Sequence, residues 1–124
     1  CAGILGILSV VLSGQIGVYR GKSKVGIGDG GDKELFCRLR KQGNFVEYVP
    51  LALVLLGLLE LSGAAGSMAI NILGAMLVIG RILHPLGLKA NGAPNILRTV
   101  GMIGTVPMIL ITSIWLVYAY INVM

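Results

Sequence analysis

Four long apolar segments constrain the fold of this chain more than any other feature. They cover approximately residues 2–19, 45–61, 64–88 and 96–123. Each comes close to the roughly 20 apolar residues that an α-helix needs to cross the hydrocarbon core of a bilayer. With 56% hydrophobic and 12% charged residues, a soluble domain of 124 residues would have too little polar surface to cover them. The sequence therefore predicts an all-α integral membrane protein, a single four-transmembrane-helix bundle over residues 1–124.

The lysines and arginines predict the orientation of the bundle. All ten lie in or beside two connections: seven between residues 20 and 41, and then Arg81, Lys89 and Arg98. By the positive-inside rule, we expect both of these connections to be cytoplasmic and both termini to lie on the other side. The net charge of +5 then belongs to one membrane face, where anionic lipid headgroups or an anionic ligand would be attracted. A chain without a soluble basic domain gives no indication of nucleic-acid binding.

Polar residues run directly into the second apolar segment, between residues 38 and 50. Residues three and four apart share a helix face, so Arg40, Asn44 and Glu47 are predicted to line up. Gln42 and Tyr48 fall on the flanking faces. An ionisable group at this depth is costly, by about 2.5–3.5 kcal/mol, and should therefore face protein or water and have a partner.

Further basic groups are predicted to gather at the same membrane face as this polar stretch. They are Arg20 at the end of the first segment, Arg81 and His84 late in the third, and Arg98 at the start of the fourth. Arginines bind carboxylates in a bidentate manner, and a guanidinium lowers the pKa of a neighbouring thiol. A zwitterionic molecule with several carboxylates, such as glutathione, matches this set. A metal site is not expected, because the chain has one histidine and no cysteine at ligand spacing from it.

Short-range signals predict how the segments begin, end and pack. The second helix is predicted to begin near residues 32–34, where acidic residues form a helix start, and Asn91, Gly92 and Pro94 predict a turn before the fourth. Small residues recur every four positions in the first segment, at Ser9, Ser13, Gly17 and Gly21. Such a stripe is typical of helices whose backbones approach closely in lipid.

The second-helix motif resembles the signature of a known family. Residues 40–50 are similar to the pattern Arg-x-x-x-Asn-x-x-Glu-Tyr-x-Pro of the MAPEG proteins, the membrane-associated proteins of eicosanoid and glutathione metabolism. Residues 28–31 and 80–84 resemble the small bacterial branch. The resemblance covers essentially the whole chain. It implies a homotrimer in a bacterial inner membrane, with glutathione bound between adjacent subunits near the cytosolic face.

The resemblance also implies residue roles. Arg40, Asn44, Glu47 and Tyr48 correspond to glutathione-binding residues. Arg20 corresponds to a basic residue at the end of helix 1, and Arg98 to the helix-4 arginine that stabilises the thiolate. With the flanking polar groups, the predicted glutathione site is catalytic Arg98 and binding residues Arg20, Arg40, Gln42, Asn44, Glu47, Tyr48, Arg81 and His84. Where catalytic relatives carry tyrosines late in helix 3, this chain has His84 and Leu88.

Three functions fit these observations, and the first is preferred. It is a glutathione S-transferase-like protein that conjugates, or reduces, lipophilic small molecules partitioning into the bilayer. The second is a non-catalytic lipid-binding or scaffold protein with the same fold. The third is a small four-helix multidrug transporter, which would be expected to hold an essential carboxylate in its first helix. The first segment here carries no charge before Arg20.

Overall fold

Four helices follow one another along the chain in a computed structural model, which describes residues 1–93 and 95–123. They are α1 (Ala2–Ser23), α2 (Lys33–Leu61), α3 (Ser67–Gly87) and α4 (Ile96–Val123). All four are long and apolar enough to cross a membrane. The prediction of an all-helical chain with four long apolar helices is confirmed. Pro94, which was predicted to punctuate the turn before α4, lies outside the described residues.

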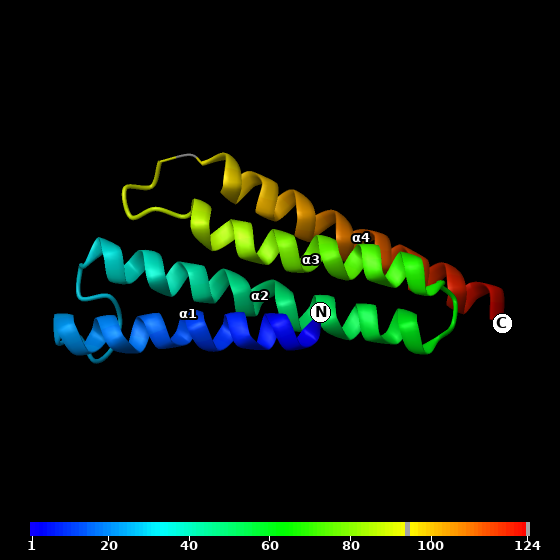
Figure 1. Ribbon diagram of the computed structural model, residues 1–124, viewed down its shortest axis with the longest axis horizontal. Coiled ribbons are helices and arrows are strands. Elements are labelled where there is room, and N and C mark those ends of the chain that lie inside the picture. The colour runs from blue at the N-terminus through cyan, green and yellow to red at the C-terminus, as the bar shows by residue number, and fades with distance from the viewer. Residues whose placement is uncertain (94, 124) are drawn as a thin grey trace.

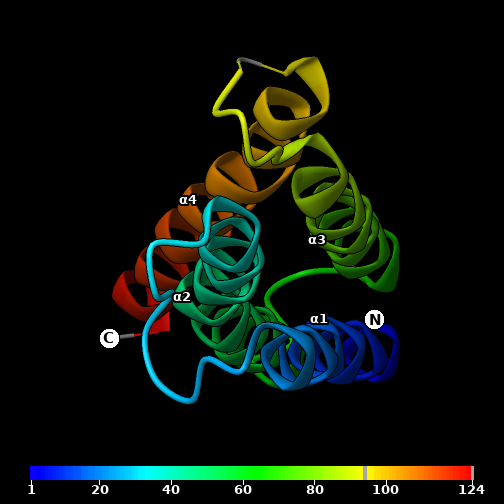
Figure 2. The ribbon, with the colours of Figure 1, turned by 90° about the vertical axis from the view of Figure 1, so that its left-hand side faces the viewer.

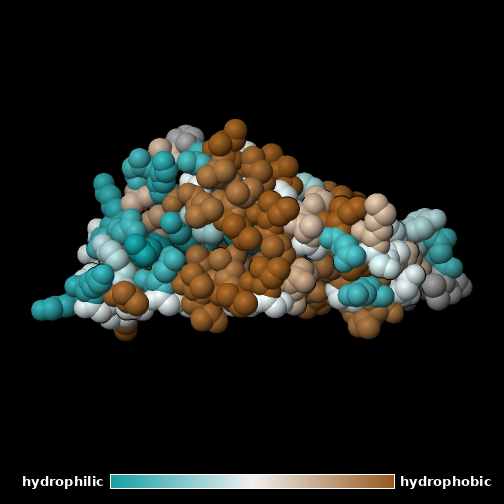
Figure 3. All heavy atoms as spheres, viewed as in Figure 1, coloured by the Kyte–Doolittle hydropathy of each residue, from teal (hydrophilic) through white to brown (hydrophobic). Residues whose placement is uncertain are grey.

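The two basic connections lie at the same end of the bundle. The α1–α2 and α3–α4 connections are at one end, and the short α2–α3 turn is at the other (Figure 1). Hydrophilic atoms gather at the first end, and hydrophobic atoms cover the middle of the bundle on the face shown in Figure 3. This arrangement agrees with the charge pattern, while the side of the membrane on which this end lies stays a prediction.

The predicted end of the first helix was wrong by about a turn. The first helix continues past Tyr19 to Ser23, whose hydroxyl donates to the Tyr19 carbonyl at 3.0 Å, and the helix ends at Lys24 in a left-handed conformation (φ 55°). The third helix begins at Ser67, three residues into the apolar segment that starts at residue 64. A turn through Gly63 (φ 67°) occupies the intervening residues, and only glycine adopts that backbone conformation without strain.

The start of α2 was predicted correctly, and its cap also ties α1 to α2. Asp32 is the N-cap and accepts hydrogen bonds from the backbone N–H groups of Glu34 and Leu35 at 2.8 and 3.1 Å. The Tyr19 hydroxyl of α1 donates to its other oxygen at 3.1 Å. The N–H of Leu35 and these other donors stabilise the carboxylate and hold the pKa of Asp32 below its ordinary range.

The closest helix packing in the molecule is between α3 and α4, where glycines face one another. A Cβ added to Gly101 would lie 2.8 Å from the Gly80 carbonyl oxygen and 2.7 Å from the Cβ of His84. A Cβ on Gly104 would lie 3.0 Å from the Met76 carbonyl oxygen. These positions therefore have to be glycine for the two backbones to come so near.

The small-residue stripe of α1 makes few contacts among the described residues: the Ser13 hydroxyl accepts a hydrogen bond from Gln42 of α2 at 3.1 Å, but its two glycines are open. Gly17 and Gly21 have nothing within 4 Å of an added Cβ. The helix packs on α2, and more lightly on α3, through another face that buries Leu5, Leu12 and Ile16 (Figure 2). This face carries large apolar side chains, which make more contacts with the neighbouring helices than the small residues of the stripe could.

Candidate functional site

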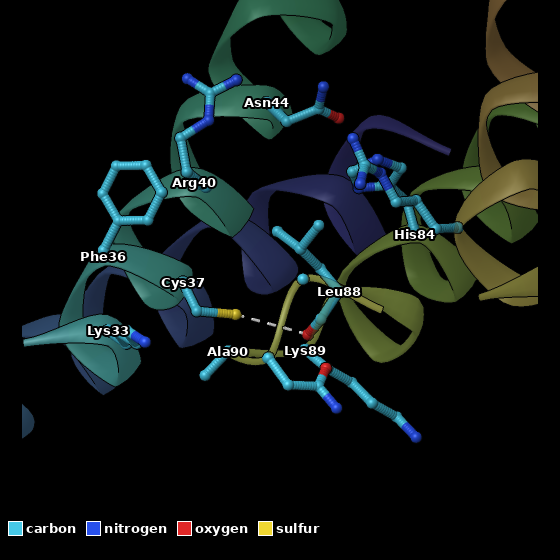
Figure 4. Close-up of a pocket in the computed structure, with 12 residues that line it drawn as sticks. Lys33, Phe36, Cys37, Arg40, Asn44, His84, Leu88, Lys89 and Ala90 are labelled. Atoms are coloured by element: carbon cyan, nitrogen blue, oxygen red, sulfur yellow. Dashed lines mark hydrogen bonds between the residues drawn. The ribbon is translucent and has the colours of Figure 1, made fainter. Parts of the chain in front are cut away.

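A cleft of about 530 Å³ opens at the end of the bundle that carries the two basic connections. Its walls come from the first half of α2, the end of α3, the connection after it and the first turn of α4 (Figure 4). This volume is typical of small-molecule sites. The lining residues are Lys33, Phe36, Cys37, Arg40, Asn44, His84, Leu88, Lys89, Ala90, Asn91, Gly92 and Arg98.

One face of α2 supplies a wall of the cleft. Lys33, Cys37, Arg40 and Asn44 are spaced by four, three and four residues, which places them on one side of a helix. Arg40 and Asn44 were predicted as site residues, whereas Lys33 and Cys37 were missed. The same helical spacing, extended one and two turns towards the helix start, would have found both.

His84 and Arg98 reach the cleft because α3 and α4 approach so closely. The Cβ position of Gly87 meets the backbone nitrogen of Arg98, and that of Gly101 meets His84. His84 is only 4% exposed, and its side chain forms no hydrogen bond with the residues that the structure describes. The glycine packing therefore sets where both side chains stand relative to α2.

The lining of the cleft is positively charged. It includes Lys33, Arg40, Lys89 and Arg98, and no aspartate or glutamate among the described residues lines it. Glu47 lies nearby and pairs with Arg40, with 3.5 Å between Nη1 and Oε1. A cleft with four cations favours an anionic ligand, and its two guanidinium groups suit carboxylates.

Arg81 stands behind the cleft and holds Asn44. It is 1% exposed and donates from Nη1 to the Asn44 Oδ1 at 2.9 Å and from Nε to the Thr105 Oγ1 at 2.9 Å. The Tyr48 ring lies 5.4 Å from its guanidinium. These contacts join α2, α3 and α4 around a charge that would otherwise be costly inside the bundle.

The hydrogen bond from Arg81 fixes the orientation of the Asn44 amide in the wall of the cleft. Because the amide oxygen accepts from Arg81, the Nδ2 group is the part left to bind a ligand. The two N–H bonds of that group can only donate. The wall from Arg40 to Asn44 therefore presents donors and selects a ligand with acceptor oxygens, in agreement with its charge.

The thiol of Cys37 also lines the cleft. It is buried at 4% exposure and donates from Sγ to the Leu88 carbonyl oxygen at 3.5 Å (Figure 4). This bond joins α2 to the segment after α3. We therefore assign Cys37 a packing role in the wall of the cleft.

The other predicted site residues are divided between supporting positions and positions away from the cleft. Glu47 and Tyr48 touch it indirectly, through Arg40 and Arg81. Gln42 turns towards α1, where its Nε2 donates to the Ser13 hydroxyl at 3.1 Å. Arg20 donates to the Val25 carbonyl oxygen at 3.1 Å and so closes the α1–α2 connection. Neither of these two residues lines the cleft within a single chain.

Comparisons with known proteins agree with the architecture. The model of the family described as "MAPEG family" matches residues 1–118. Two similar proteins are both described as "Inner membrane protein YecN", one from Escherichia coli K12 and one from Escherichia coli O6:H1. Each is 44% identical over 64 residues, which are 52% of this chain and 48% of the relative, so the match spans about half of either protein. No solved structure matches.

Proposed function

The chain belongs to the MAPEG family, and from this membership we propose that it is a membrane-bound glutathione S-transferase-like protein. In this proposal glutathione binds in the cleft at the basic end of the bundle. A lipophilic electrophile arrives from the bilayer, and the glutathione sulfur conjugates or reduces it. The chain is a MAPEG protein with four apolar helices, and about half of its length is related to an inner membrane protein.

The single observation that carries the proposal is the charge of the cleft. Four cations and no carboxylate line a space of about 530 Å³ in the described part of the chain. Glutathione carries two carboxylates and one ammonium at neutral pH. The four cations are enough to bind both carboxylates, and Glu47, beside Arg40, offers an acceptor for the ammonium.

The residues divide into two groups by what they would do. Arg40 and the donor face of the Asn44 amide hold the charged ends of the tripeptide. Arg98 stands on the opposite wall, on α4, where it makes no ion pair with the described residues and is free to face the sulfur. A guanidinium beside a thiol favours the thiolate, which is the nucleophilic form.

The exposure of the Arg40–Glu47 pair favours assembly with further copies of the chain. Their side chains are 51% and 50% exposed on a membrane-spanning helix, where contact with lipid is costly. A closed homotrimer, which family membership suggests, would cover the pair with a neighbouring subunit. We expect native mass spectrometry in mild detergent to give a trimer, and a monomer would contradict this part of the proposal.

Calorimetry on the purified protein in detergent tests the binding step directly. We expect reduced glutathione to bind, and its diester, which lacks the negative charges, to bind at least about tenfold more weakly, since a charge-assisted hydrogen bond contributes about 1.5–3 kcal/mol. Arg40→Gln should weaken glutathione binding by a similar factor. An analogue with alanine in place of the cysteine should still bind, because the contacts to the carboxylates supply most of the affinity.

Lys41→Gln is the matched control for Arg40→Gln. Lys41 is the next residue on α2, carries the same charge and does not line the cleft. Equal losses in the two variants would show that general positive charge, and not the cleft, attracts glutathione. Failure of millimolar glutathione to bind would overturn the proposal. Binding without conjugation of any lipophilic electrophile would favour the non-catalytic alternative.

A further inference from the structure

A second, smaller cavity lies between α1 and α2, apart from the cleft. Its volume is about 190 Å³, and its lining shares no residue with that of the cleft. Gln15, Val18, Tyr19 and Lys22 line it from α1, and Arg38 lines it from α2. It therefore offers two cations and an amide beside an apolar side chain.

Arg38 is held in place more firmly than an ordinary surface arginine. Its Nη2 pairs with Glu34 Oε1 at 2.9 Å, and its guanidinium stacks 4.8 Å from the centre of the Tyr19 ring. That ring is fixed in turn, because its hydroxyl donates to Asp32. A guanidinium fixed by two neighbours, one of them itself held in place, loses little conformational entropy when a ligand binds.

The arginine nevertheless keeps an unused donor. Its Nη1 makes no hydrogen bond or ion pair with the described residues, whereas its Nε, also without a partner, is buried out of reach of a ligand. Glu34 occupies only the Nη2 end of the group. Around it, residues 20–41 contain seven lysines and arginines against three acidic residues, so Glu34 does not cancel the positive charge of this region. An additional anionic acceptor would suit the site.

The depth of the lining residues indicates what kind of anion. Lys22 is in the last turn of α1, and Val18, which is 64% exposed, is one helical turn deeper towards the apolar middle of the bundle. The charge of Lys22 thus lies near the surface, and the apolar side chain of Val18 lies about 6 Å deeper. A phospholipid has the same order, with its charged headgroup above its acyl chains. A water-soluble phosphate would use the first feature only.

We propose that the cavity between α1 and α2 binds the phosphate group of an anionic phospholipid. Lys22 and the Nη1 group of Arg38, which Glu34 leaves unpaired, contact the phosphate oxygens. The first part of an acyl chain lies along Val18. The site is independent of the glutathione proposal, because none of its lining residues belongs to the cleft.

Lipid retention measured by native mass spectrometry tests the proposal. The protein is reconstituted in vesicles of mixed phosphatidylglycerol and phosphatidylcholine, extracted in mild detergent and analysed for bound lipid. We expect about one phosphatidylglycerol per chain to be retained over phosphatidylcholine. The Lys22→Gln/Arg38→Gln variant should retain it about 10- to 30-fold less well, as expected for two cations near a membrane surface.

The control variant is Lys24→Gln/Lys41→Gln, which removes the same charge at the same end without touching either cavity. Equal loss of phosphatidylglycerol in both double variants would overturn the proposal. Lys22→Gln alone keeps the Arg38 contacts with Glu34 and Tyr19, and its retention of phosphatidylglycerol should still fall several-fold. A loss in this variant would therefore not be explained by misfolding around Arg38. If millimolar glycerol phosphate displaced bound phosphatidylglycerol as effectively as added lipid does, the ligand of the cavity would be a soluble phosphate and not a lipid. Glutathione binding should be unchanged throughout.

Discussion

Alanine in place of Gly101 should lower the apparent melting temperature of the detergent-purified protein by on the order of 10 °C. The added Cβ would lie 2.7 Å from the Cβ of His84 and 2.8 Å from the Gly80 carbonyl oxygen, so the two helices must move apart. Overpacking of this kind typically costs about 1–3 kcal/mol, which in a domain of this size is a shift of several degrees per kcal/mol. Gly101→Val should be worse still and abolish folding.

Helix propensity makes this prediction a demanding one. Replacing a helical glycine by alanine gains up to about 1 kcal/mol where space is available, so the steric cost has to exceed that gain before any loss is seen. Gly57 on α2 has nothing within 4 Å of an added Cβ, and Gly57→Ala should leave the melting temperature unchanged or raised. Gly104→Ala, whose Cβ would lie 3.0 Å from a backbone oxygen, should fall between the two. Similar melting temperatures for the Gly101 and Gly57 variants would show that the helices separate without cost.

The number and order of the helices could be predicted from the sequence, because crossing a bilayer requires long apolar segments and leaves few alternatives. The polar face of α2 was predictable for a similar reason. Arg40, Asn44 and Glu47 share a helix face by spacing alone, and the ion pair between Arg40 and Glu47 follows from it.

The helix pairing was harder to predict, because nineteen glycines offer many small-residue stripes. The stripe on α1 is more regular than the glycines of α3 and α4, yet its glycines, Gly17 and Gly21, have no close neighbour in the described part of the chain. Close packing depends on two faces meeting, and one helix's sequence describes only one of them. The contact of Gly80 with Gly101 joins positions 21 residues apart across a turn, which no local pattern reports.

The same limit applies to the candidate site. A count of arginines at one membrane face cannot show that Arg81 points into the bundle while Arg98 lines the cleft. The difference arises from the partners. Thr105 and Asn44 accept from Arg81 at 2.9 Å each, and both come from other helices. Arg20 and Gln42 likewise do not line the cleft within one chain, because their side chains bond to the Val25 carbonyl oxygen and the Ser13 hydroxyl.

Arg98→Leu should reduce the rate of glutathione conjugation by on the order of 10²-fold, which is typical for loss of one electrostatic stabiliser of a developing or resting charge. In the proposed mechanism Arg98 acts on the sulfur, whereas Arg40 and Asn44 hold the carboxylates. Contacts to the carboxylates are the same in ground and transition states, so losing one mainly raises the KM for glutathione. Losing Arg98 should instead leave binding largely intact and raise the pKa of the bound thiol. The measurement is the thiolate absorbance of bound glutathione against pH.

The fold gives a reason to expect this separation of binding from rate. Arg98 is exposed in the first turn of α4, and its backbone N–H is satisfied by the Asn95 carbonyl at 3.1 Å, so its side chain can be replaced without disturbing α3 or α4. Arg98→Lys keeps the charge, so the pKa of the bound thiol should stay closer to its wild-type value than in Arg98→Leu. Arg20→Leu removes an arginine that closes the α1–α2 connection outside the cleft and should leave the pKa unchanged. A thiol pKa that moved in Arg20→Leu and not in Arg98→Leu would assign the sulfur to Arg20, and would mean that the ligand enters from the α1 side of a neighbouring subunit.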